Sequence, residues 1–199
     1  MLEESRKLGF LGPGPVAAHV EHAAGLAAAI ESTGDPLPRQ AADLGSGGGV
    51  PGLSLALHFA QCRWLLVESA VRRAAFLREA VGTLGLDARV AVVESRAEAV
   101  GRTEWRSTVD LVTARGFGPP AVVAECAAPL LPVGGRLVVS EPPGGDVARW
   151  PPDGLSVLGL AVGSTVTAGG ARFQVLRQVS ACPDKFPRRV GVPAKRPLF

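Results

Sequence analysis

The stretch DLGSGGGVPG, at residues 43–52, is the strongest indication of how this chain folds. It connects a short apolar run, Ala41–Leu44, to a second apolar run of helical character, Leu53–Ala60. Glycine tolerates backbone angles that other residues avoid, and it lets the main chain approach a ligand closely. In a doubly wound sheet, ligands bind beyond the carboxyl ends of the strands, where this loop would lie. The stretch therefore predicts a strand, a ligand-binding loop and a helix in succession.

Outward from this loop, short apolar runs alternate with segments of helical pattern. Further strands are expected at 64–67, 89–93, 109–114 and 136–139, and helices at 15–31, 71–84 and 120–131. This alternation predicts crossover connections and a central, mostly parallel sheet with helices on both faces. After Ser140 the pattern changes, and two more strands are expected at 155–162 and 172–179, around a turn at 165–170.

Length and composition predict one α/β domain with an extension at each end. Hydrophobic residues make up 47% of the 199 residues and charged residues 20%, which is enough apolar material for a core. We expect a helical extension at 1–39, a Rossmann-like domain at 40–182 and a basic, proline-rich tail at 183–199. The apolar runs are too short to span a bilayer, and the first seven residues do not resemble a signal peptide. A monomeric, cytoplasmic protein without a membrane partner is expected.

The cysteines and histidines do not indicate a metal site. Cys62, Cys126 and Cys182 lie far apart without the paired spacing of zinc ligands, which predicts free thiols. His19 and His22 share one face of an expected helix, but no further ligands stand near them in the sequence. We therefore expect no metal, and histidines that are exposed or partly packed.

Two acids flank the glycine loop in the expected sheet. Asp43 precedes Gly45 by two residues, and Glu68 ends the second strand, 23 residues after Gly45. An acid at that strand end can accept hydrogen bonds from the ribose hydroxyls of an adenosine; alternatively, Glu68 caps the following helix. The negative charge of Asp43 suits a sulfonium cation better than the pyrophosphate of a dinucleotide. A Walker-type phosphate loop is excluded, because no Gly-Lys-Ser/Thr follows the glycines.

A third cluster, SRAE at 95–98, follows the third strand, where the adenine edge of such a cofactor would lie; alone, it is more typical of a helix start. Further segments are RRAAFL at 72–77, VTAR at 112–115 and FPRRVGVPAKRPL at 186–198. Together with the glycine loop, Glu68 and SRAE, they resemble the bacterial 16S ribosomal RNA guanine-N7 methyltransferases, also called the glucose-inhibited division protein B family. The resemblance implies a Rossmann-like class I methyltransferase that depends on S-adenosyl-L-methionine and methylates 16S ribosomal RNA.

The resemblance also implies the cofactor contacts. They are Gly45, Val50, Ala97, Glu98 and Arg115, with Glu68 near the ribose. The position of the loop adds Asp43 and Gly47 to this set. Arg115 ends the fourth strand and is the candidate for a catalytic role at the rim where cofactor and acceptor meet. No general base is expected, because guanine N7 offers a free lone pair and carries no proton.

Two segments depart from the family pattern. The family usually carries an Arg-His-Leu-Leu-Asp-Ser-like helix; the corresponding stretch Glu21–Leu26 keeps the histidine but not the arginine, the aspartate or the serine. After the fifth strand the family often has Lys-Gly, where this chain has Ser140-Glu141-Pro142-Pro143. A diverged relative is the alternative: a protein that binds S-adenosylmethionine but acts on a small molecule, or a nucleotide-binding module without catalysis.

The positive charge concentrates in the tail. From Asp184 to Phe199 five basic residues stand against one acid, a net charge of +4, which leaves −1 for the remainder of the chain. An irregular basic segment can follow a phosphate backbone without reading bases, and the prolines oppose a regular helix. The expected RNA-binding residues are Lys185, Arg188, Arg189, Lys195 and Arg196.

Overall fold

The computed structural model describes all 199 residues, apart from the side chain of Val147. Its centre is a seven-stranded sheet in the order β3-β2-β1-β4-β5-β7-β6. The strands are β1 (Gln40–Leu44), β2 (Arg63–Glu68), β3 (Val90–Glu94), β4 (Leu111–Ala114), β5 (Arg136–Glu141), β6 (Leu160–Ala168) and β7 (Ala171–Gln178). The first five run parallel, and β7 is antiparallel to both of its neighbours. The predicted α/β fold with a mostly parallel sheet is confirmed.

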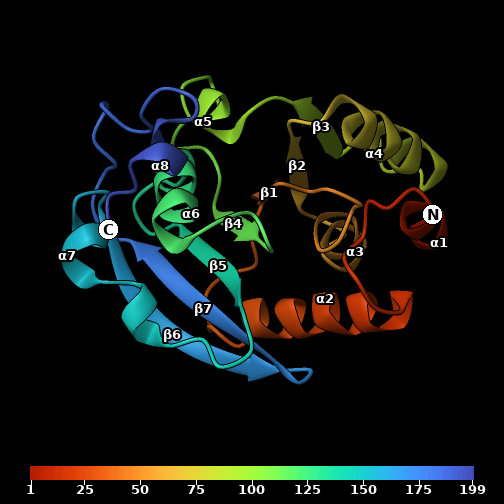
Figure 1. Cartoon of the computed structure of the whole chain (residues 1–199), viewed down its shortest axis with the longest axis horizontal. Helices are drawn as coiled ribbons and strands as arrows, with labels where there is room; N and C mark the ends of the chain where they lie inside the picture. Colours follow the sequence, from red (N-terminus) through yellow and green to blue (C-terminus); the bar gives the residue numbers. More distant parts are fainter.

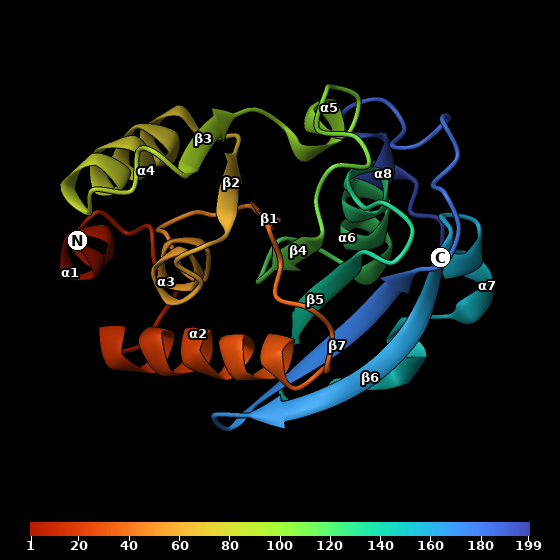
Figure 2. The same cartoon turned by 180° about the vertical axis from the view of Figure 1, so that it is seen from behind.

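Helices cover both faces of this sheet (Figures 1 and 2). One face carries α2 (Val16–Glu31), α3 (Gly52–His58) and α4 (Val71–Thr83). The other carries α5 (Ala97–Val100), α6 (Pro120–Ala127), the 3-10 helix η1 (Ala128–Leu130) and α7 (Pro152–Ser156). Along β2, Trp64 and Leu66 pack in the core beneath α2, α3 and α4, whereas Leu65 and Val67 pack in the core beneath α5, α6 and α7. The strands are thus apolar on both faces, as crossover connections require.

The strand order reverses at β1, which pairs with β2 on one side and with β4 on the other. Because the three strands run parallel, their carboxyl ends meet at one edge of the sheet. The glycine loop leaves β1 at this edge, Glu68 ends β2 there, and Arg115 directly follows β4. Such a switch point is where doubly wound sheets bind ligands.

The C-terminal hairpin corrects two predictions. Residues Pro152–Ser156 form helix α7, so the strand expected at 155–162 begins only at Leu160. Proline fits the first turn of a helix, where the N–H groups have no partner within the helix, and Pro152 therefore starts α7 instead of a strand. The turn expected at 165–170 is confined to Gly169-Gly170, both with positive φ, as in a two-residue hairpin. The strand at 172–179 is confirmed to within one residue.

The helix predicted at 120–131 is also shorter than expected. Helix α6 ends at Ala127, and residues 128–130 form η1. Pro129 lacks the N–H group that a further α-helical turn needs, so the chain tightens into a 3-10 turn.

The N-terminal segment folds back over the glycine loop. Helix α1 (Leu2–Lys7) lies beside α4 in both views (Figures 1 and 2). The buried Ser5 hydroxyl donates to the carbonyl oxygen of Gly48 at 3.0 Å, and the Phe10 ring meets the Phe76 ring edge-on, with centroids 5.7 Å apart. Residues 1–12 therefore cover one side of the loop. None of the described helices is long and apolar enough to cross a membrane.

Candidate functional site

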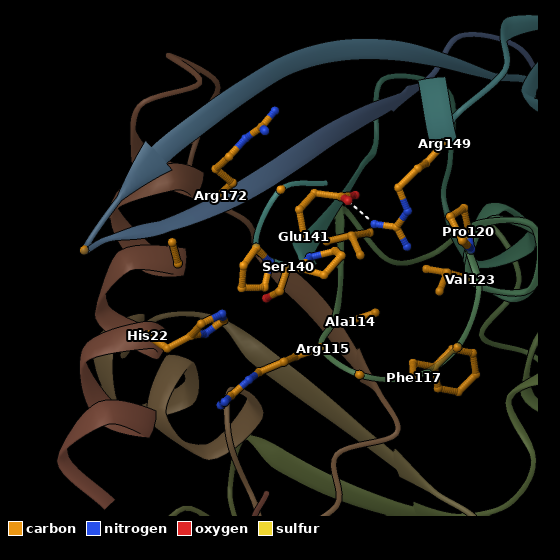
Figure 3. A pocket seen from close by; sticks show the side chains of 18 of the residues that line it. His22, Ala114, Arg115, Phe117, Pro120, Val123, Ser140, Glu141, Arg149 and Arg172 are labelled. Atoms are coloured by element: carbon orange, nitrogen blue, oxygen red, sulfur yellow. Dashed lines mark hydrogen bonds and ion pairs between the residues drawn. The ribbon is translucent and has the colours of Figure 1, made fainter. Parts of the chain in front are cut away.

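A cavity of about 850 Å³ opens beside the carboxyl ends of β4 and β5 (Figure 3). Its walls come from helix α2, from the loops that follow β4 and β5, and from the β6–β7 turn. The lining includes His22, Arg115, Phe117, Ser140, Glu141, Arg149 and Arg172. Segments that are far apart in the sequence thus enclose one space, whose volume is typical of sites for small organic groups.

The glycine loop adjoins this cavity through Phe117. Gly45 and Ser46 donate their N–H groups to the carbonyl oxygen of Val67, at 2.9 and 3.1 Å, which fixes the loop against β2. Gly45 has a φ of +69°, and a Cβ atom there would lie only 2.8 Å from the ring of Phe117. Glycine is therefore required at this position by both backbone angle and space. Because Phe117 also lines the cavity, its ring separates the loop from the cavity.

Asp43 lies beneath the loop and not on its surface. Its side chain is fully buried, and Oδ1 accepts a hydrogen bond from the Thr113 hydroxyl at 2.8 Å. Burial raises the pKa of Asp43 to about 6, although hydrogen bonds from Thr113 and Ser46 oppose the shift. Asp43 therefore supports the loop and places a titratable negative charge under it, whereas direct contact with a ligand was the prediction for this residue.

Glu68 holds the loop from the neighbouring strand. Its Oε2 accepts the N–H of Gly47 at 2.9 Å, and its Oε1 accepts the N–H of Ala70 at 2.8 Å. The second contact holds the N–H of Ala70, the N-cap residue of α4, so Glu68 orders the approach to the helix without capping it as the alternative prediction had it. Each carboxylate oxygen has a second lone pair, which leaves both able to accept a further hydrogen bond from a ribose hydroxyl.

The residues at this edge fit S-adenosylmethionine by their chemistry. Glu68, although buried, offers hydrogen-bond acceptors beside the loop for a ribose, and Asp43 offers negative charge for a cationic sulfur. Gly45, Gly47 and Val50 remain partly accessible along the loop. The loop, Glu68 and the cavity together can hold a charged nucleoside beside a second, separate group.

Arg115 stands at the junction of loop and cavity. It follows β4, lines the cavity, and its Nη2 donates to Nδ1 of His19 on helix α2 at 2.8 Å. Burial lowers the pKa of Arg115, and the charge of Asp43 opposes that shift. His19 is buried, although it was predicted to be exposed or only partly packed.

Two polar atoms in the cavity wall are buried without a hydrogen-bond partner among the described residues. They are Nδ1 of His22 and Oγ of Ser140. Burial, followed by the charges of Arg115 and His19, lowers the pKa of His22 to about 4, so its imidazole is neutral at pH 7. Since buried polar atoms usually find partners, this wall is suited to a polar ligand or to ordered water.

The cavity wall beside Ser140 carries an ion pair. The Glu141 carboxylate, which is 4% exposed, accepts hydrogen bonds from Arg149 and, at 2.7 Å, from the Trp150 indole N–H. Arg172 donates to the Gly145 carbonyl oxygen at 2.6 Å in the same loop. The departure from the family pattern at 140–143 therefore falls in the cavity wall, where these contacts hold the loop 141–150.

The structure places Ala97 and Glu98 at the start of α5, after β3, as the alternative helix-start prediction had it. The Glu98 side chain is 2% exposed, and Oε1 accepts the N–H of Gly191 at 3.0 Å and a hydrogen bond from Arg96 at 3.3 Å. Burial opposes ionisation, but these contacts outweigh it and lower the pKa of Glu98. Its carboxylate is therefore engaged by the tail, which leaves the backbone at 97–98 as the available contact for an adenine.

The tail packs on α5 and α6, and one of its predicted RNA-binding residues is engaged there. Arg188 forms a bidentate pair with the fully buried Glu125, in which Nε donates to Oε1 at 2.8 Å and Nη2 donates to Oε2 at 2.5 Å. Arg188 is thus engaged in a structural ion pair, and its predicted contact with RNA stays a prediction. The remaining basic residues of the tail are exposed: Lys185, Arg189, Lys195 and Arg196. The only helix among these described residues is the short α8 (Val192–Lys195).

Sequence reasoning missed the cavity wall. His22 and Phe117, which line the cavity, and His19, which lies behind it against Arg115, were not assigned to the site, and Glu141 was noted only as a departure from a family pattern. For Glu141 a signal existed, because it ends the fifth strand at the same edge as Glu68 and Arg115. For the histidines none existed, since their role depends on where α2 packs.

Comparison with known proteins agrees with this geometry. The family model for rRNA small subunit methyltransferase G matches residues 16–141. A protein named ribosomal RNA small subunit methyltransferase G from Pelotomaculum thermopropionicum is 38% identical over 164 residues, which are 78% of this chain and 68% of that protein. The protein of that name from Rubrobacter xylanophilus is 38% identical over 170 residues, 79% of this chain and 64% of that protein. The matched part thus spans about two thirds of these relatives.

Solved structures show the same fold at low identity. PigF with SAH superposes with a TM-score of 0.61 at 16% identity, covering 89% of this chain and 64% of that one. The antibiotic-resistance methyltransferase Kmr gives a TM-score of 0.55 at 17% identity, covering 75% of this chain and 92% of that one. These likenesses concern the fold, which is that of Rossmann-like methyltransferases.

Proposed function

The chain belongs to the rRNA small subunit methyltransferase G family, and from this premise we propose that it transfers a methyl group from S-adenosylmethionine to N7 of a guanine in 16S ribosomal RNA. The observation that carries the proposal is the junction at the β1–β4 switch point. There the loop held by Glu68 and the cavity beside β4 and β5 share one boundary, formed by Phe117 and Arg115.

The cofactor half of this site is the loop side of the boundary. When bound, S-adenosylmethionine supplies an activated methyl group on a positively charged sulfur. Glu68 would accept hydrogen bonds from the ribose, and the backbone of Gly45–Val50 and of Ala97 would hold the rest of the nucleoside. The negative charge of Asp43 beneath the loop attracts the cationic sulfur through a medium of low polarity.

The acceptor half is the cavity. An in-line transfer needs the acceptor lone pair aligned with the methyl carbon and water excluded, and little else from the protein. Guanine N7 has such a lone pair and no proton to lose. A site without a general base suits this reaction, and the neutral His22 and the paired Glu141 are consistent with it.

RNA as acceptor is supported by the exposed cations of the tail. Lys185, Arg189, Lys195 and Arg196 can contact phosphates, while an unpaired base enters the cavity. We place the protein, as a monomer, with the small ribosomal subunit or its assembly intermediates in the cytoplasm.

The decisive experiment is methyl transfer from radiolabelled S-adenosylmethionine to 16S ribosomal RNA that lacks the modification, followed by mapping of the labelled nucleotide. Labelled N7-methylguanine at one position supports the proposal. Cofactor binding without transfer to any RNA, or transfer to a small molecule instead, contradicts it and favours the diverged-relative alternative. Arg115→Ala provides the matched variant, which should bind cofactor and RNA but transfer the methyl group slowly.

A further inference from the structure

Helix α2 holds Arg115 through one histidine. Nδ1 of His19 lies 2.8 Å from Nη2 of Arg115, and Nε2 of His19 lies 3.1 Å from the carbonyl oxygen of Gly12. A guanidinium group can only donate, so Nδ1 must be the acceptor. The proton of the neutral ring then sits on Nε2, which donates to Gly12. The two contacts select one tautomer and one orientation of the ring.

The surroundings make this arrangement rigid. His19 is 4% exposed, and both of its ring nitrogens have partners, so the ring has no alternative place to point. Arginine is a long side chain that loses much rotational freedom when it is held in one conformation. A buried acceptor that fixes the guanidinium in advance removes that loss from the reaction step.

The N-terminal segment that contains Gly12 also contacts the glycine loop. Gly12 belongs to the N-terminal residues that cover the loop, where Ser5 donates to the Gly48 carbonyl oxygen at 3.0 Å. One side of that segment therefore meets the cofactor loop, and the other side, through His19, meets Arg115. The charged and titratable groups that face Arg115 are Asp43 beneath the loop and the two histidines of α2.

We propose that His19 is a positioning residue for Arg115. Its Nδ1 accepts a hydrogen bond that orients the guanidinium at the boundary between the cofactor and the methyl-accepting base, and His19 itself contacts neither the cofactor nor that base. The inference rests on the proposed function, in which Arg115 acts at the reacting centre. It concerns residues outside the glycine loop and outside the tail. The residue acts through one nitrogen atom, which allows a sharp test.

Two conservative variants separate the two contacts of the ring. In His19→Asn the new amide oxygen can take the place of Nδ1, so the acceptor for Arg115 is kept and the contact with Gly12 is lost. In His19→Gln the amide nitrogen reaches the place of Nε2, so the contact with Gly12 is kept and the acceptor for Arg115 is lost. Turnover of labelled cofactor on unmodified 16S RNA should stay near the wild-type value for His19→Asn and fall about tenfold or more for His19→Gln. The Kd for S-adenosylhomocysteine should change in neither.

A double variant tests whether His19 acts through Arg115. If it does, His19→Gln should lower turnover no further in a protein that already carries Arg115→Ala. Equal turnover in the two single variants, or turnover that follows their thermal stability, would overturn the proposal. So would a full additional loss in the double variant, because His19 would then act by another route.

A readout without turnover keeps this inference separate from the proposed function. Nitrogen-15 NMR of the histidine rings in the protein without substrate should show His19 as the Nε2–H tautomer, and Arg115→Ala should shift its Nδ1 signal. An Nδ1–H tautomer refutes the arrangement even if the wild-type protein methylates RNA. Conversely, a wild-type protein that methylates no RNA, but shows this tautomer and shift, refutes the proposed function and leaves the contact intact.

Discussion

Glu68 and Gly47 are joined by a hydrogen bond of 2.9 Å, in which the carboxylate at the end of β2 accepts the N–H of the loop that follows β1. Two neighbouring parallel strands are thereby linked at the edge proposed to bind the cofactor. The carboxylate orders the loop and presents acceptors beside it, so a ligand finds the loop already arranged. Because Glu68 also accepts the Ala70 N–H, it serves the fold and the site together.

Glu68→Ala should weaken S-adenosylmethionine binding about tenfold or more, because at least one charge-assisted hydrogen bond to the ribose is lost. It should also lower thermal stability, since two N–H groups lose their acceptor. Isothermal titration calorimetry measures the first effect and calorimetric unfolding the second. The matched control is Glu94→Gln at the end of β3, whose exposed ion pair with Arg78 contributes little. Normal cofactor affinity together with lower stability would mean that Glu68 only orders the loop and the helix start.

Asp43 and His22 should shape the pH dependence of stability in opposite directions. Burial raises the pKa of Asp43 to about 6, so its contribution to stability is complete at low pH and is lost as pH rises through about 6. The pKa of His22 is lowered to about 4, so its contribution is present above pH 6.5 and is lost as pH falls through about 4. Between about pH 4 and 6 the two effects oppose each other, and the wild-type protein should show a flat profile there.

Single variants separate these contributions. In Asp43→Asn, the free energy of unfolding should rise with pH over this interval, since the effect of His22 remains. In His22→Gln the free energy of unfolding should fall with pH, since the effect of Asp43 remains. Denaturant titrations at several pH values measure both slopes. Parallel profiles for the two variants would show that neither group carries the shift.

The sequence was sufficient for the parts of the site that belong to strand ends. The positions of Glu68 and Arg115 follow from short apolar runs and from the rule that parallel strands place their carboxyl ends together. The loop conformation follows from its glycines. These are local features, and local patterns predict them well. The prediction of a strand at 155–162 was wrong at its start, because Pro152 begins a helix there. The preference of proline for the first turn of a helix outweighs the strand preference of the apolar residues that follow.

What the sequence left open depends on packing between distant segments. Arg188 pairs with Glu125, 63 residues earlier, and Arg115 pairs with His19, 96 residues earlier. Nothing in the local pattern distinguishes an arginine that will meet a buried acid from one that stays in solvent. The sequence therefore predicted a uniformly basic, exposed tail, although the side chain of Arg188 pairs with a buried carboxylate.

Arg188→Ala should destabilise the protein strongly. It removes both side-chain donors to the fully buried Glu125 and leaves it only the backbone N–H of residue 188, and breaking a buried ion pair from one side costs about 3–5 kcal/mol. The free energy of unfolding from urea titration measures the loss. The companion variant Arg188→Ala with Glu125→Leu should recover much of it, because the unpaired charge is removed. No recovery in the double variant would show that Arg188 stabilises the tail by packing and not by its charge.

The exposed tail cations should govern RNA affinity without affecting stability or cofactor binding. Lys195 and Arg196 are exposed; Lys195 ends α8, which lies far from α1 in both views of the fold (Figures 1 and 2). If each contacts one phosphate, Lys195→Gln with Arg196→Gln should weaken binding to unmodified 16S RNA and reduce the slope of log K against log salt by roughly 0.7 per lost single-strand contact. The matched control is Arg6→Gln with Lys7→Gln in α1, which removes the same charge from exposed side chains at the other end of the molecule. Filter binding between about 50 and 200 mM salt distinguishes the pairs, because counterion release dominates binding in this range. Equal losses in both pairs would indicate that only net charge matters. An unchanged slope in the tail pair, with lower thermal stability, would mean that the tail serves the fold alone and that the RNA approaches from another face.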